Sequence, residues 1–210
     1  MQGRVLVTGF MVFAGYQFNP SEWIAATLDG QVIEGYRVHS LVLPVSLRRA
    51  LPILKEHLET LKPQVVLGLG LAPRARKVTV ELVAVSLAHY PDYPDEDGYR
   101  ADLQLLDNGG LRTYTTRIPL EAVRACRGKG YPVTVSVSVG TYLCNAVAYA
   151  IHRYAHHNNA IGGFLHLPPT TELAHRHGLT NTTPLWLELE TVKCILRETI
   201  RLLHKAPGKL

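Results

Sequence analysis

The chain has 210 residues, of which 47% are hydrophobic and 19% are charged, with a formal net charge of +5. This composition is typical of a globular protein with a sizeable core. No apolar run approaches the ~20 residues that cross a bilayer, and the first ten residues lack the features of a signal peptide. We therefore expect no membrane contact and a cytoplasmic location. The basic residues are mostly dispersed, so nucleic acid is not an expected partner.

The residue pattern alternates between strands and helices along the chain. Asn19 is the expected cap of the first helix, with Pro20 in its first turn and Gly30 after its end, and Pro52 predicts a kink or a late start in the second. The predicted order is strand 4–10, helix 18–30, strand 36–45, helix 46–62, strands 63–71 and 77–87, loop 89–110, strand 111–118, helix 119–129, strand 131–140, helix from 141, strand 162–168 and helix 186–205.

This alternation predicts an α/β fold with a mostly parallel, twisted central sheet and helices on both faces. No repeat or linker interrupts the chain, so residues 1–210 are expected to form a single domain, with 89–110 as a long loop within it. Ligand sites in such folds form beyond the carboxyl ends of the strands.

The cysteines do not show a pattern for disulfides or zinc. Cys126, Cys144 and Cys194 are odd in number and widely spaced, so we expect three free thiols. His152 and His156 have the i, i+4 spacing of zinc ligands but no glutamate lies between them. We expect no metal site.

Cys144 lies where the strand at 131–140 gives way to a helix. Thr141 is the expected cap, which puts Cys144 in the first helical turn. There, free N–H groups and the helix dipole favour the thiolate and can lower the pKa of a cysteine from its ordinary value of ~8.5. The alternative is that Cys144 is a small apolar residue on a buried face. His166 lies near the end of the strand at 162–168 and shares an edge with Cys144 if the two strands are parallel. A thiol, an imidazole and a third polar residue are the parts of nucleophilic acyl transfer. Spacing alone leaves open which of the ten histidines meets the thiol.

Several motifs together resemble the pyroglutamyl peptidase type I family, the pyrrolidone carboxyl peptidases. The specific pair is GTYLCN at 140–145 followed by GFLHLP at 163–168, and weaker matches are VLVTGF at 5–10, NPS at 19–21, LPVS at 43–46, VTVELVAVS at 78–86 and PDEDG at 94–98. The resemblance implies a single-domain α/β/α cysteine hydrolase that needs no metal or cofactor and forms a homo-oligomer, a tetramer or a dimer.

The resemblance also implies the site. Cys144 would be the nucleophile, His166 the general base and acid, and Glu81 the carboxylate that orients the imidazole. The substrate would be a peptide whose amino terminus is closed as a 5-oxoproline lactam. Phe10 and Phe13 would pack against the lactam ring, and Leu71 would also contact the substrate.

The sequence departs from the family in the segments expected to surround the substrate. The segment GFMVFAG replaces the usual G-F-x-P-F-G-G, and GLAPRA at 70–75 replaces G-Q-A-G-G-R, so Leu71 lacks an amide while Pro73 and Arg74 replace glycines. The arginine that usually precedes P-D-N-x-G is missing. Two alternatives therefore stay open: the same triad acting on a different acyl amide or ester, and a non-catalytic protein that binds a small ligand or peptide end.

Overall fold

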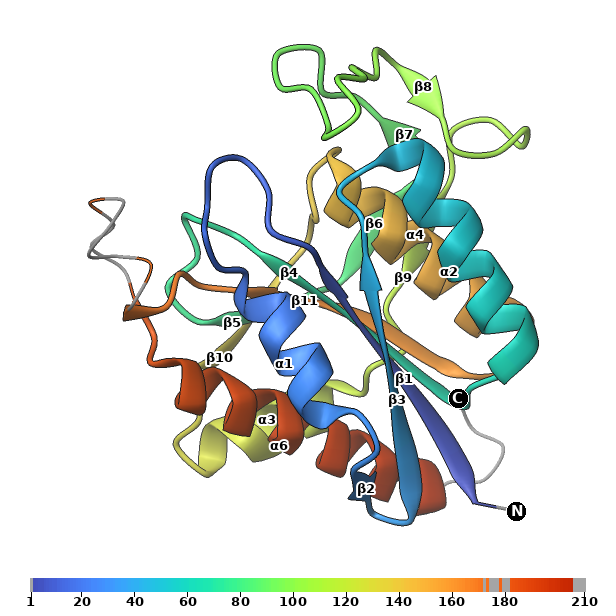
Figure 1. Ribbon diagram of the computed structural model, residues 1–210. Coiled ribbons are helices and arrows are strands. Elements are labelled where there is room, and N and C mark those ends of the chain that lie inside the picture. The colour runs from blue at the N-terminus through green and yellow to red at the C-terminus, as the bar shows by residue number, and fades with distance from the viewer. Residues whose placement is uncertain (1, 172, 174–177, 179–181, 206–210) are drawn as a thin grey trace.

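A mixed sheet forms the centre of the computed structural model, which describes residues 2–171, 173, 178 and 182–205 (Figure 1). Within these residues the sheet has seven strands in the order β10-β5-β11-β4-β1-β3-β2. Their bounds are β1 (Gly3–Phe10), β2 (Val32–Ile33), β3 (Tyr36–Leu43), β4 (Val65–Leu71), β5 (Val78–Glu81), β10 (Val133–Ser136) and β11 (Ile161–Leu167).

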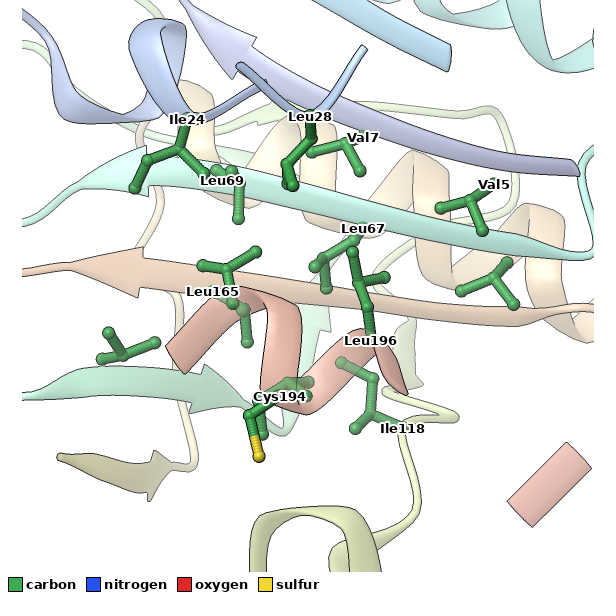
Figure 2. Close-up of a cluster of buried hydrophobic side chains, with 14 of the residues drawn as sticks. Val5, Val7, Ile24, Leu28, Leu67, Leu69, Ile118, Leu165, Cys194 and Leu196 are labelled. Atoms are coloured by element: carbon green, nitrogen blue, oxygen red, sulfur yellow. The ribbon is translucent and has the colours of Figure 1, made fainter. Parts of the chain in front are cut away.

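Helices cover both faces of this sheet, which confirms the predicted α/β fold with helices on both sides. One face packs against α1 (Pro20–Leu28), α3 (Leu120–Gly128) and α6 (Leu185–Lys205), and the other against α2 (Leu47–Leu61) and α4 (Leu143–His157). Alternate residues of β1 enter the two cores, with Val5 and Val7 on the first face and Leu6 on the second. Figure 2 shows the first core, where Leu67 and Leu165 pack against α6. None of the described helices combines the length and apolar character needed to cross a membrane.

The strand directions correct one expectation. β1, β3, β4 and β11 are parallel, but β5 runs antiparallel to β11, and β10 runs parallel to β5. The strand before Cys144 and the strand that carries His166 therefore run in opposite directions. The supposed parallel pair does not bring these residues together; the segment after β10 and the start of α4 do so instead.

Three local predictions also change. The expected strand 77–87 is divided into β5, β6 (Val83–Val85) and β7 (Leu87–Ala88), because the chain leaves the central sheet after β5 and β6 pairs with β9 (Thr113–Thr115). The loop 89–110 contains a short strand, β8 (Gln104–Leu105), which pairs with β7. The late start considered for the second helix is wrong, because α2 begins at Leu47 and includes Pro52.

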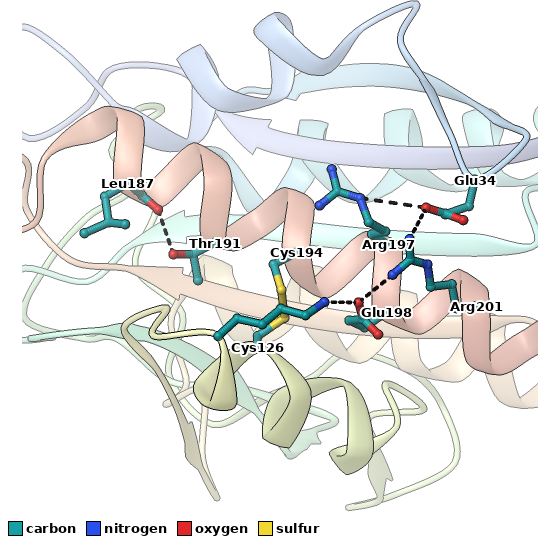
Figure 3. Close-up of a disulfide and its surroundings, with 9 residues drawn as sticks. Glu34, Cys126, Leu187, Thr191, Cys194, Arg197, Glu198 and Arg201 are labelled. Atoms are coloured by element: carbon teal, nitrogen blue, oxygen red, sulfur yellow. Dashed lines mark hydrogen bonds and ion pairs between the residues drawn. A yellow bond between two sulfur atoms is a disulfide. The ribbon is translucent and has the colours of Figure 1, made fainter.

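A disulfide joins α3 to α6 (Figure 3). It links Cys126 and Cys194, whose Cα atoms are 6.0 Å apart, while Cys144 is a free thiol. The expectation of three free thiols is therefore wrong for Cys126 and Cys194, because their separation of 68 residues gives no sign that α3 and α6 pack together. Closing a loop of this length stabilises the fold by about 4 kcal/mol in the chain-entropy description.

His152 on α4 makes the stability of the fold dependent on pH. Its side chain is fully buried, and its Nδ1–H donates to the carbonyl oxygen of Tyr114 at 3.2 Å. Burial lowers the pKa of His152 to about 4 from 6.5. Between these values the unfolded chain binds the proton more readily, so stability is fully present above pH 6.5 and falls as the pH approaches 4.

We expect the wild type to lose about 3 kcal/mol more unfolding free energy than the variant His152→Gln between pH 7 and pH 4. Urea unfolding across this range measures the difference. The variant His156→Gln, at an exposed position one turn further along α4, should keep the wild-type dependence. Equal pH dependence in the wild type and His152→Gln would contradict this account.

Candidate active site

Glu81 and His166 form a buried pair on two neighbouring strands. Glu81 ends β5 opposite Phe164 of β11, and His166 lies two residues further along β11, so both side chains point to the α4 face of the sheet. His166 donates from Nδ1 to Glu81 Oε1 at 2.7 Å, and the two side chains are 13% and 3% exposed. The carboxylate thus fixes the orientation of the ring and leaves Nε2 available for chemistry.

Cys144 lies beside His166 because a glycine of β4, Gly70, leaves room for the sulfur atom next to the imidazole. Gly70 is the β4 partner of His166, and a Cβ atom on Gly70 would lie 2.9 Å from Cys144 Sγ and 2.9 Å from Phe164. Any side chain at residue 70 would therefore displace the thiol. Cys144 is the second residue of α4, as expected from its place in the first helical turn.

The site favours a protonated imidazole next to the thiol. Burial lowers the pKa of His166, but its interactions with the neighbouring Cys144 and Glu81 raise it, and the net result is a pKa of about 9. His166 is therefore an imidazolium at neutral pH. A cation therefore lies beside the Cys144 sulfur, in the kind of electropositive surroundings where nucleophilic cysteines are found.

The first turn of α4 presents free backbone donors next to the thiol. The N–H groups of Leu143 and Cys144 have no acceptor in the described part of the chain, and the cap residue Tyr142 makes no side-chain capping bond. The expectation that Thr141 caps this helix is wrong, because the cap residue is Tyr142. The hydroxyl of Thr141 instead donates to the carbonyl oxygen of His89 at 2.7 Å. Free N–H groups at a helix start can hold an oxyanion.

A cavity of about 690 Å³ opens in front of Cys144. The three residues expected to bind substrate, Phe10, Phe13 and Leu71, all line it, together with Cys144, whereas Glu81 and His166 do not. The wall is mostly apolar and includes several aromatic side chains, which suits a flat uncharged ring.

Sequence reasoning missed most of the aromatic residues of this wall, of which Tyr90 and Tyr142 contact each other. Tyr142 stacks on Phe13 with ring centroids 6.4 Å apart and meets Tyr90 edge-on at 4.7 Å. Tyr142 is part of the GTYLCN motif and could have been found there. Tyr90 lies in the long loop, where nothing in the local sequence indicates which side chain turns inward.

In two of the matched motifs, polar side chains hold the segments that form the cavity in place. In NPS, Ser21 Oγ accepts from the backbone N–H of Phe10 at 3.1 Å, and Asn19 donates to the carbonyl oxygen of Met11 at 3.1 Å. In GTYLCN, the fully buried Asn145 accepts from Val85 N and donates to the carbonyl oxygens of Val85 and Leu87. These bonds hold the Phe10 segment and the β6–β7 segment in place around α4.

No group of three or more histidine, cysteine, aspartate or glutamate side chains converges as metal ligands would within the residues that the structure describes.

Comparison with known proteins identifies the family. The model of the pyroglutamyl peptidase family matches residues 3–201. The chain belongs to this family. The pyrrolidone-carboxylate peptidase of Thermococcus litoralis is 38% identical over 80% of this chain and 78% of its own length, and that of Halalkalibacterium halodurans is 36% identical over 84% and 89%. The chain is thus a cysteine-type peptidase of a family that removes amino-terminal pyroglutamate.

Solved structures agree with the family assignment. The pyrrolidone carboxyl peptidase from Thermococcus litoralis superposes with a TM-score of 0.91 at 33% identity, covering 98% of this chain and 96% of its own. That of Pyrococcus furiosus gives 0.90 at 31% identity, covering 95% and 99%. The likeness therefore extends over nearly the whole fold.

The Glu81–His166 pair predicts a specific pH–rate profile. Loss of the His166 proton should reduce kcat/KM for a pyroglutamyl amide above about pH 9, because kcat/KM reports the pKa values of the free enzyme. In the variant Glu81→Gln the alkaline limb should move to lower pH, since the charge of Glu81 raises the pKa of His166.

The profile is measured with a fluorogenic pyroglutamyl amide from pH 5 to pH 10. Glu59→Gln, at an exposed carboxylate of α2, serves as the control and should leave the limb in place. An alkaline limb that does not move in Glu81→Gln would refute the role given to this carboxylate.

Proposed function

We propose that Cys144, His166 and Glu81 are the nucleophile, the general acid and base, and the orienting carboxylate of a peptidase that removes an amino-terminal 5-oxoproline through a thioester. The observation that carries this proposal is the buried 2.7 Å hydrogen bond between Glu81 and His166, next to the free thiol of Cys144. No observation favours a different acyl substrate or a protein that only binds.

The geometry supports a two-step acyl transfer. The thiolate of Cys144 attacks the carbonyl carbon of the 5-oxoprolyl residue, and the oxyanion that forms accepts from the backbone N–H groups of Cys144 and Leu143. His166 then protonates the leaving amine, which breaks the amide bond and leaves a thioester. Water attacks the thioester with His166 as base, which releases 5-oxoproline and restores the thiolate. Each oxyanion donor typically contributes about 10²–10³ in turnover.

The cavity supports a lactam as the acyl group. A 5-oxoprolyl end carries no ammonium, so it needs apolar contact and a few hydrogen bonds rather than a counter-charge. Phe10 and Phe13 offer that contact in the cavity wall. Leu71 extends the apolar surface at the position where the sequence pattern of the family has an amide.

We further propose that residues 1–210 act as one hydrolase domain and as a homo-oligomer. One sheet with a core on each face supports a single domain. The homo-oligomer is proposed from the family to which the chain belongs. The cytoplasmic location stays a prediction. In the cytoplasm, which contains thiol reductants, the Cys126–Cys194 disulfide would be protected by the burial of both cysteines.

The variant Cys144→Ala tests the proposal. It should lower release of the fluorescent amine from a pyroglutamyl amide by about 10⁴-fold or more, because the acyl-enzyme can no longer form. The double variant Cys126→Ser/Cys194→Ser keeps the free thiol and should keep the wild-type rate at a temperature where it remains folded. Wild-type turnover by a folded Cys144→Ala enzyme would overturn the proposed nucleophile.

A further inference from the structure

The cavity has more room than a lactam ring needs. Its volume of about 690 Å³ spans the wall from Phe10 to the loop residues Pro73, Arg74, Asp92 and Tyr93. A five-membered ring stacked on aromatic side chains fills only part of such a space. The remainder is therefore available to the part of the peptide that leaves.

Arg74 is the permanent cation of this space. Among the described residues that line the cavity, Arg74 is the one lysine or arginine and Asp92 the one carboxylate. Arg74 is exposed and forms no ion pair or hydrogen bond with any residue that the structure describes, Asp92 included. Its guanidinium is free to bind an anion.

The backbone presents Arg74 on a fixed turn. Ala75 N donates to the carbonyl oxygen of Ala72 at 2.9 Å, and Ala72 N donates to that of Leu167 at 2.9 Å, which ties the turn to β11. Pro73 and Arg74 are the two central residues, and neither has a positive φ, as in a type I turn with proline in its preferred place. The two residues that depart from the glycines of the family pattern thus build a rigid support for a charged side chain.

The turn begins beside the nucleophile. Gly70, against which Cys144 Sγ lies, is followed by Leu71 in the cavity wall and then by the turn itself. A side chain on this turn can therefore meet the first residue after the cleaved bond.

Short blocked peptides offer one fixed charge to this arginine. A peptide closed as a lactam has no ammonium, so its backbone charge is the terminal carboxylate, which is ionised at neutral pH. In a dipeptide that carboxylate belongs to the residue next to the cleaved bond, about 3.8 Å from the lactam residue in Cα spacing. Guanidinium and carboxylate match in shape and form paired hydrogen bonds.

We infer that Arg74 binds the terminal carboxylate of 5-oxoprolyl dipeptides and makes free dipeptides preferred substrates over their amides. This inference rests on the proposed function and names the substrate class of the same site. Arg74 is a specificity-determining residue in this account and takes no part in the chemical step.

The test compares pyroglutamyl-alanine with pyroglutamyl-alanine amide as substrates of the wild type, Arg74→Gln and Arg76→Gln, measuring kcat/KM by chromatography of the released alanine or alanine amide. The wild type should prefer the acid by about three- to fivefold at low salt, as expected for an exposed charge pair, and the preference should shrink in 1 M NaCl. In Arg74→Gln the ratio of kcat/KM for the acid to kcat/KM for the amide should fall to about one, because kcat/KM for the acid decreases. Arg76 is exposed and does not line the cavity, so Arg76→Gln should keep the wild-type ratio.

Equal kcat/KM values for the acid and the amide in the wild type would overturn this inference while leaving the proposed function intact. A preference for the acid that persists in Arg74→Gln would likewise overturn this inference and leave the proposed function intact. Failure of the folded wild type to cleave either dipeptide would overturn the proposed function and, with it, this inference.

Discussion

The hydrogen bond between Glu81 and His166 is the interaction on which the rest of the site depends. It joins two strands across a boundary where the sheet changes direction, and it places a carboxylate and an imidazole together in a nearly dry position. Neither charge would be stable there alone, since leaving one member of a buried pair without its partner costs about 3–5 kcal/mol. Cys144 lies next to the same imidazole, and its interaction with the ring also raises the pKa of His166.

Close packing holds this arrangement in register. Gly70 gives the sulfur its space on β4, Asn145 ties α4 to the segment that follows β5, and the bonds from Asn19 and Ser21 hold the Phe10 segment at the cavity. Gly70, Ser21 and Asn145 do not line the cavity, so they act through the packing of the segments around it. In enzymes generally, a displacement of a reacting group by about 1 Å is enough to reduce turnover severely.

The sequence predicted those features whose signals are local. Asn19, Pro20 and Gly30 marked the first helix, and the chain forms α1 with Asn19 as its cap. Strand direction is set by tertiary packing, so the reversal of β5 and β10 was invisible, and the meeting of Cys144 with His166 was expected for the wrong geometric reason. The Cys126–Cys194 disulfide was missed for the same reason, because it depends on two helices that are distant in the chain. The placement of Tyr90 in the cavity likewise follows from the path of a long loop.

His166 is expected to be charged at neutral pH because Glu81 and Cys144 flank it. The most direct measurement is a titration of its ring by NMR with ¹⁵N-labelled histidine, the signal being assigned by its loss in His166→Gln. The account predicts an imidazolium that persists through pH 7 and titrates at about pH 9. A midpoint near 6.5, the value of an unperturbed histidine, would contradict the account.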